Sequence, residues 1–199
     1  MGWKKFMDTC ASYNIVITEE VAKLASRTYR TTHNKVVRMW GQQEAAAKEA
    51  VHTGKTQKCG HVLWALHDGF LYCRLPSGRC LAYYQPELGP MMTSWGQEKE
   101  ALTYMSTNSV TRKWERTGTY GGKIVENITQ AVARDLMASA MLRCEDEGYE
   151  VVLSVHDELI TENREGSVEE FEKLMSETPS WAEGIPVEVE GWSGLRYMK

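Results

Sequence analysis

The first fifty residues repeat apolar positions with the period of an α-helix. Thr18 stands at an N-cap position, because two glutamates follow it where the helix dipole favours anions. The pattern predicts a short helix from Lys4 to about Ser12. A second helical stretch runs from Thr18 to about Val51, with a break near His33.

After a polar joint at residues 54–60 the period changes from helical to extended. Short runs rich in β-forming residues are separated by turn sequences, which predicts an antiparallel meander. These runs lie at residues 61–66, 69–75 and 79–84, and further strands are expected at 102–105 and 113–116. The segment 85–97 carries Pro86 and Pro90 and is predicted to be a loop.

A long helix is predicted from about Gly122 to Glu147, with Gly148 as the residue that ends it. One face of this helix is apolar. The other face is polar and lacks acids, because helical spacing brings together Lys123, Asn127, Gln130 and Arg134.

The next segment, residues 150–162, has two β-rich arms around His156-Asp157 and predicts a hairpin with an acid at its tip. Ser167 and Glu170 form a capping-box pattern for a helix to about Glu177. Residues 185–190 are predicted to be a last strand. The element pattern as a whole predicts an α+β fold with an antiparallel sheet.

Charge is unevenly distributed along the chain. The net charge is −4, but residues 158–190 hold ten glutamates and only two basic residues. A basic stretch with one acid, Glu115, contains Arg112, Lys113, Arg116 and Lys123. A phosphate backbone would respond to this local stretch rather than to the total charge.

Five irregularly spaced cysteines favour a reducing compartment over a disulfide framework. No apolar run approaches the length of a membrane span, and the first residues lack an apolar signal core. We therefore expect a cytoplasmic protein without a membrane partner.

The hairpin tip is the strongest candidate for chemistry. Phosphoryl transfer to a hydroxyl uses two divalent cations, and Mg²⁺ takes one or two carboxylates with phosphates completing its ligands. Asp157 meets this requirement if both hairpin arms are buried and fix it, and Glu158 lies next to it. Taken alone, an acid in a hairpin turn is more often a good turn former.

The surrounding residues favour the metal-binding interpretation of Asp157 over the turn-forming one. The segment 126–137, Glu-Asn-Ile-Thr-Gln-Ala-Val-Ala-Arg-Asp-Leu-Met, is followed by Val155-His156-Asp157-Glu158-Leu159. Together they resemble the DNA polymerase I family (family A), and in particular its short bacteriophage members. The resemblance extends through residues 111–114 and 120–127 to the ending at 190–197, and so covers effectively the whole chain.

The resemblance implies a palm subdomain at residues 57–199, carrying motif C on the hairpin and a long helix that faces DNA. Residues 1–56 would be the last helices of the fingers. Asp157 would be the metal carboxylate, Glu158 a secondary metal or water partner, and His156 the residue that steadies the primer terminus. The minor groove would be read by Gln130, with Asn127 beside it; phosphate contacts would come from Lys123, Arg134, Lys113 and Arg116.

The family also needs a second metal carboxylate in motif A and a nucleotide-binding helix, motif B. Residues 1–6 resemble the stretch directly after motif B, and Asp8, Asp68 and Asp135 do not stand in a motif A setting. We therefore expect a chain that is inactive alone and that shares a two-Mg²⁺ site, a primer–template and a dNTP with a second polypeptide. Self-association is the alternative. A phage-encoded polymerase of this kind would act in the host cytoplasm.

Other interpretations remain. The chain could be a non-catalytic palm remnant or accessory module that binds nucleic acid or a partner protein. A metal-dependent nuclease built on Asp157 and Glu158 lacks further acids in suitable settings. Cys73 and Cys80 are expected to face each other across a hairpin, near Cys59 and His61, but their spacing is unusual for zinc and favours buried cysteines. Within the basic stretch, Trp114 and Tyr120 are the expected aromatic DNA contacts.

Overall fold

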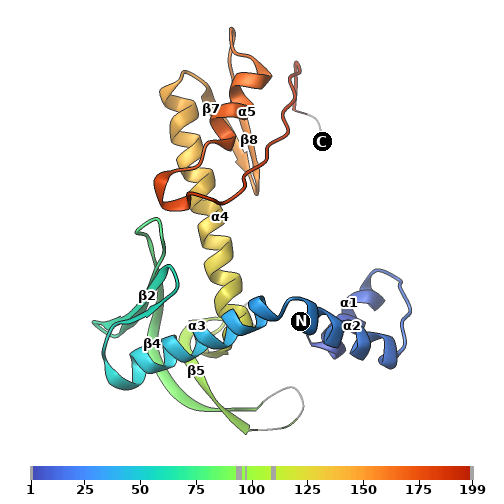
Figure 1. The fold of residues 1–199 in the computed structure, drawn as a ribbon, viewed down its shortest axis with the longest axis vertical. Helices are drawn as coiled ribbons and strands as arrows, with labels where there is room; N and C mark the ends of the chain where they lie inside the picture. The colour runs from blue at the N-terminus through green and yellow to red at the C-terminus, as the bar shows by residue number, and fades with distance from the viewer. Residues whose placement is uncertain (1, 93–95, 97, 109–110, 198–199) are drawn as a thin grey trace.

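The computed structural model describes residues 2–92, 96, 98–108 and 111–197. It has helices and antiparallel strands in the α+β combination that the sequence predicts. Figure 1 shows a sheet crossed by a helix at one end, a long helix rising from it, and a hairpin with a short helix at the other end.

The N-terminal helices begin and end where the sequence predicts. They are α1 (Trp3–Ser12), α2 (Glu19–Thr32) and α3 (Asn34–Thr53). The Thr18 hydroxyl accepts a hydrogen bond from the Val21 N–H at 3.3 Å, which confirms the N-cap of α2. The helical conformation is interrupted at His33, between α2 and α3. Helix α3 is followed by Gly54, whose φ of 68° is the left-handed conformation that glycine adopts readily.

Six strands follow in an antiparallel meander, in the spatial order β1-β2-β3-β4-β5-β6. Their bounds are β1 (Gln57–Cys59), β2 (Val62–His67), β3 (Phe70–Arg74), β4 (Cys80–Met92), β5 (Glu98–Thr107) and β6 (Trp114–Thr119). Each strand pairs antiparallel with the next one along the chain.

The prediction of a loop at residues 85–97 is wrong for its first part, since β4 continues to Met92. Pro86 stands where the register shifts, between Tyr84 and Glu87, and a bulge tolerates its missing N–H. Pro90 pairs with Glu100 of β5. Residues 93–95 and 97 lie outside the described residues.

The hydrophobic core lies between α3, the sheet and α4 (Gly121–Asp146). Trp64 and Leu71 of the sheet, Ala47 of α3 and Ile124 of α4 are fully buried. The Trp64 indole N–H donates to the side-chain oxygen of Gln43 on α3 at 2.9 Å, so its polar atom is satisfied inside the core. The core therefore joins residues from both sides of the domain boundary expected after residue 56.

The long helix α4 ends as predicted, because Gly148 has a φ of 82° and Tyr149 N–H bonds back to the Cys144 carbonyl at 2.8 Å. It leads into β7 (Glu150–Val155) and β8 (Glu158–Glu162), which form a separate two-stranded sheet. The hairpin prediction is thereby confirmed.

The C-terminal part contains α5 (Val168–Ser176) and the short 3₁₀ helix η1 (Ser180–Ala182). Ser167 caps α5, accepting from Glu170 N–H at 3.1 Å. The strand predicted at residues 185–190 is wrong: this stretch forms no ladder with any described strand. Apolar and polar residues do alternate in this stretch, but a strand also needs a neighbouring strand to form hydrogen bonds with its backbone N–H and C=O groups.

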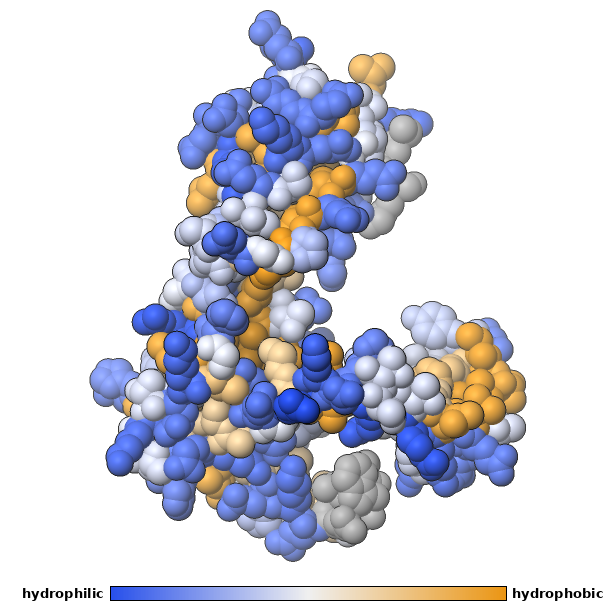
Figure 2. Space-filling model, viewed as in Figure 1, coloured by the Kyte–Doolittle hydropathy of each residue, from blue (hydrophilic) through white to orange (hydrophobic). Residues whose placement is uncertain are grey.

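Apolar side chains remain exposed on the α1–α2 lobe, where Figure 2 shows an orange patch. Val16 is 98% exposed, and Ile15 and Leu24 are also exposed. Among the described residues, no helix combines the length and apolarity that a bilayer span requires.

Candidate metal and nucleic-acid site

The turn between β7 and β8 consists of two residues, His156 and Asp157, with Val155 paired to Glu158 across the hairpin. His156 has a φ of 53°, the left-handed conformation that tight two-residue hairpins require. The Asp157 side chain is 87% exposed, and its oxygen lies 3.4 Å from His156 Nδ1. The turn therefore presents a carboxylate to solvent with an imidazole beside it.

Glu158 begins the returning strand and is held by the C-terminal tail. The Tyr197 hydroxyl donates to a Glu158 carboxylate oxygen at 2.7 Å. No local sequence pattern signals this contact, because the two residues are 39 positions apart. A tyrosine from the tail thus orients the second acid of the pair.

The expectation that both hairpin arms are buried is wrong. Neither β7 nor β8 contains a buried residue, and Val152 and Leu153 are about half exposed. The hairpin is fixed at its base instead. Val151 N–H donates to the Glu145 carboxylate at 2.7 Å, and the Asn163 amide donates to the Gly148 carbonyl at 3.1 Å.

β7 runs back alongside the C-terminal half of α4 (Figure 1). A strand of six residues spans about 20 Å, the rise of about 13 helical residues. The His156-Asp157 turn therefore returns toward the level of Arg134. This packing brings the Asp157 and Glu158 carboxylates to the same half of the molecule as Arg134, which belongs to the polar face of α4.

The four residues expected on that face differ in their surroundings. Gln130 and Arg134 are exposed. Lys123 is also exposed and lies 3.1 Å from the Glu126 carboxylate. Asn127 is half-buried and donates to the Tyr83 hydroxyl at 3.3 Å, and burial raises the pKa of that tyrosine to about 12. The face is open to a ligand at Gln130 and Arg134, whereas Asn127 contacts the core.

The two basic residues expected near β6 also differ. Lys113 is exposed ahead of the strand. The Arg116 guanidinium donates to the Gln85 carbonyl at 2.9 Å and to the Glu87 carboxylate at 2.8 Å. These bonds straddle the bulge of β4, so Arg116 braces the sheet.

The carboxylates fit part of a magnesium site. Asp157 and Glu158 supply hard oxygen ligands, and Mg²⁺ in phosphoryl-transfer sites takes one or two carboxylates from the protein. Within the described residues, no group of three or more His, Cys, Asp or Glu side chains is arranged to hold a metal ion. The pair could therefore anchor a metal but not enclose one.

The other candidates are placed away from this pair. Cys73 faces Leu81 and Cys80 faces Arg74, so the expectation that the two cysteines face each other is wrong by one position. Cys73 is buried, and burial raises the pKa of its thiol to about 12. Asp135 lies buried against Arg79.

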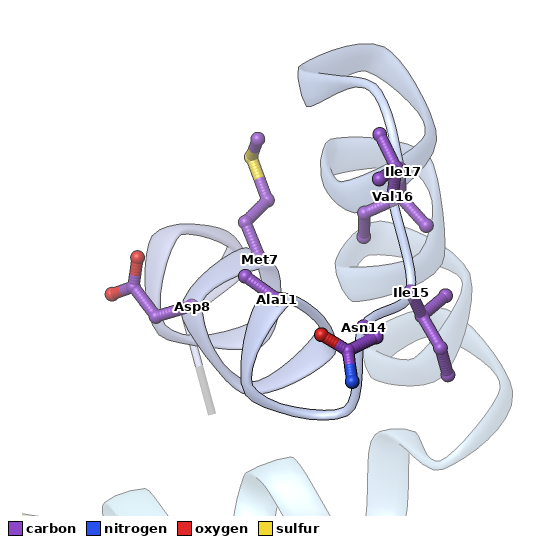
Figure 3. Close-up of a pocket in the computed structure, with 7 residues that line it drawn as sticks. All are labelled: Met7, Asp8, Ala11, Asn14, Ile15, Val16 and Ile17. Atoms are coloured by element: carbon purple, nitrogen blue, oxygen red, sulfur yellow. The ribbon is translucent and has the colours of Figure 1, made fainter.

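A hollow of about 410 Å³ lies between α1 and the link to α2 (Figure 3). It is lined by Met7, Asp8, Ala11, Asn14, Ile15, Val16 and Ile17. Its lining is largely apolar with one carboxylate, and it lies far from the hairpin (Figure 1). It offers no grouping of acids, bases or nucleophiles.

Comparison with known proteins gives this geometry a context. A curated protein of Bacillus phage SP02, named DNA polymerase, is 38% identical over 201 aligned positions, which include all of this chain. The chain matches part of a DNA polymerase. It spans 30% of the length of that relative. No family model matches the chain, and no solved structure matches it significantly.

The polymerase similarity covers the hairpin, the polar face of α4 and the C-terminal tail alike, because it extends over the full chain. The similarity to a phage DNA polymerase agrees with the resemblance drawn from residues 126–137 and 155–159.

Proposed function

We propose that this chain supplies one part of the active site of a template-dependent DNA polymerase of the DNA polymerase I family. Residues 57–199 would form the palm, with motif C on the β7–β8 hairpin, and residues 1–56 the end of the fingers. The observation that carries the proposal is the exposed Asp157 in a two-residue turn, followed directly by Glu158, in a chain similar throughout to a phage DNA polymerase.

In this proposal Asp157 and Glu158 would hold Mg²⁺. Magnesium bound there would stabilise charge on the attacking and leaving oxygens of a phosphoryl transfer. Tyr197 orients Glu158 through its hydroxyl. His156, beside Asp157, steadies the primer terminus by contact with its sugar or phosphate.

The DNA contacts are assigned by exposure. Gln130 reaches the minor groove from α4, and Arg134, Lys123 and Lys113 contact phosphates, which position DNA without reading its sequence. Asn127 and Arg116 would support these residues indirectly, because the half-buried Asn127 already binds Tyr83 and the exposed Arg116 already binds the β4 bulge.

The remainder of the site would come from polypeptide outside these 199 residues. A two-metal site needs a further anchored carboxylate, and a dNTP needs a cationic pocket. One observation supports a second polypeptide with motifs A and B, or self-association. Among the described strands, β7 and β8 pair only with each other, so each keeps an edge where another strand could pair.

Primer extension tests the proposal. The purified chain is assayed alone, and then mixed with a polypeptide corresponding to the rest of the matched polymerase, with Mg²⁺ and dNTPs. We expect synthesis only in the mixture. Asp157→Asn should lower its rate at least about a hundredfold, because a metal ligand is lost.

The chain offers a matched control for this variant. Asp68 also stands in a hairpin turn after a histidine, with a φ of 47° and a side chain 82% exposed. Asp68→Asn should leave synthesis unchanged. Equal activity of the Asp157→Asn and wild-type mixtures would refute the catalytic role.

That result would favour the second candidate, a non-catalytic palm module that binds nucleic acid or a partner. Within the described residues, Asp157 and Glu158 are not part of a group of three or more His, Cys, Asp or Glu side chains that could hold a metal ion. Such a module would tolerate Asp157→Ala in the assembly and still contribute binding.

A further inference from the structure

One face of the six-stranded sheet carries aromatic side chains outside the core. Successive residues of a strand point to opposite faces. Leu71, Cys73 and Tyr83 point into the core with α3 and α4. The residues next to them in β3 and β4, Phe70, Tyr72 and Tyr84, therefore lie on the opposite face. Together with Trp114 of β6, these three residues are called the aromatic row.

The four rings are contiguous. Ring centroids are 5.7 Å apart for Phe70 and Tyr72 and 4.9 Å apart for Phe70 and Tyr84. The Tyr84 and Trp114 centroids are 6.3 Å apart. Register supports the assignment of faces, because Phe70 pairs with Tyr84 in adjacent strands. The row thus crosses the sheet from β3 toward β6.

The row becomes more exposed along its length. Phe70 and Tyr72 are half-buried, Tyr84 is 37% exposed and Trp114 is 59% exposed. A tryptophan on a sheet edge with most of its ring in water contributes little to folding. Its exposed π-face is available to stack with a planar ligand.

The charge next to the row is positive. Arg74 lies two positions after Tyr72 on the same face of β3, and Arg112 and Lys113 directly precede Trp114. Within the described residues none of these three basic side chains has an ion pair. Of the nearby acids, Glu87 pairs with Arg116 at 2.8 Å, Glu115 accepts a hydrogen bond from the Asn108 amide, and Asp68 lies 3.2 Å from the His67 imidazole. The uncompensated charge therefore suits a polyanion.

We propose that the aromatic row with Arg74, Arg112 and Lys113 is a binding platform for single-stranded DNA. Unpaired bases stack on the exposed rings of Tyr84 and Trp114, and the basic side chains contact phosphates. Duplex DNA fits less well, because its bases are already stacked on one another. An apolar protein surface fits less well, because it would leave three basic groups without partners.

This platform is distinct from the hairpin, since it lies on the six-stranded sheet and the hairpin is a separate two-stranded sheet. The proposal does not rest on nucleotidyl transfer. If the chain is part of a polymerase, the platform would hold unpaired template or displaced strand.

The test is fluorescence anisotropy of a labelled oligo(dT) of about 16 nucleotides, titrated with the full chain and compared with a duplex of equal length. We expect tighter binding to the single strand. Trp114→Ala should weaken it about tenfold, equivalent to about 1.4 kcal/mol. Tyr84→Ala should weaken it as well, whereas Trp114→Phe, which keeps a ring, should retain most of the affinity.

Two controls separate stacking from other effects. Tyr13→Ala removes a ring that is 74% exposed on another part of the chain and should leave the affinity unchanged. Lys113→Gln should lower the salt dependence of binding by about one counterion, without changing the preference for single strands. Circular dichroism of each variant checks that the fold is retained.

The outcomes decide between occupants. Unchanged oligo(dT) affinity in Trp114→Ala overturns the proposal. If an aromatic-row variant changes the sedimentation of the chain but not its oligo(dT) binding, this face of the sheet contacts a protein. That result also overturns the proposal of a single-stranded DNA platform. Asp157→Asn should leave oligo(dT) binding intact while lowering the rate of synthesis by the mixture at least about a hundredfold, so failure of either proposal is visible without the other.

Discussion

The six-stranded sheet and the β7–β8 hairpin are both antiparallel, but they are stabilised in different ways. The sheet packs one face on α3 and α4, and Trp64, Leu71 and Leu102 are completely buried there. The hairpin has no buried residue in either strand and exposes Val152 and Leu153. Its geometry depends on the tight turn and on hydrogen bonds at its base.

The difference separates stability from chemistry. Core burial makes the sheet a rigid support, and apolar burial is the dominant favourable term in folding. The candidate metal carboxylates sit on a hairpin that has no buried residue in either strand. Such an element is easily reshaped, and its final geometry can be set by whatever covers it. Substitutions in the two regions should therefore have very different costs.

The largest effect is expected at Trp64. Trp64→Ala removes a fully buried ring and leaves the Gln43 amide oxygen without its donor. The free energy of unfolding should fall by about 3–5 kcal/mol, which would unfold a chain of ordinary stability in mild denaturant. Urea titration followed by circular dichroism measures it. A loss below about 1 kcal/mol would mean that the sheet is not the stable part of the molecule.

The next effect is expected at the ion pair that joins the sheet to α4. Arg79 binds the buried Asp135 carboxylate, and its Nη2 donates to the Ala131 carbonyl at 2.8 Å. Arg79→Ala leaves that carboxylate with a hydrogen bond from Ser77. The expected cost is about 2 kcal/mol. Arg74→Ala is the matched control, because Arg74 is exposed, and it should cost less than about 0.5 kcal/mol.

A smaller, pH-dependent effect is expected at Glu44. Its carboxylate accepts from the Gly121 N–H at the start of α4 at 2.9 Å and lies 3.0 Å from Lys99 Nζ. Burial alone would raise the pKa of Glu44, but the Gly121 hydrogen bond and the Lys99 and Lys48 ammonium groups outweigh it and lower the pKa from its ordinary value of 4.5.

Since the folded-state pKa is lowered, the ionised form stabilises the protein above pH 4.5, and this contribution is lost as the pH falls through the lowered value. Glu44→Gln should therefore cost about 1 kcal/mol at pH 7. The difference from wild type should close at acidic pH. Urea titrations at pH 7 and below pH 4 measure both. A constant difference at the two pH values would contradict the ionic role.

The same contrast explains which features could be predicted from the sequence. The cap at Thr18, the end of α4 at Gly148 and the turn at His156-Asp157 depend on a few neighbouring residues, so local patterns predict them. The continuation of β4 through Pro86 and Pro90 could not be predicted in this way, because pairing with β5 decides it. Residues 185–190 show the converse, an extended pattern without a described partner strand.

At the candidate site, the turn and the exposed Gln130 and Arg134 could be predicted from spacing. The exposure of the hairpin arms could not, since an apolar strand pattern gives no information on whether a covering surface is present. The Tyr197 hydrogen bond to Glu158 and the use of Arg116 as a brace were also missed. Each joins residues distant in sequence, and only the fold brings them together.

The smallest effect is expected on the hairpin itself. Leu153 is 47% exposed, so Leu153→Ser removes little buried surface, and the free energy of unfolding of the chain should change by less than about 0.5 kcal/mol. Urea titration of the chain alone measures this, with Leu102→Ser, at a fully buried leucine of the sheet, as the matched comparison. If another polypeptide covers the hairpin, the same Leu153→Ser variant should weaken that association while leaving the isolated chain intact. A large destabilisation of the isolated chain would instead mean that the hairpin is held by apolar packing, and the contrast between the two sheets would then be one of degree.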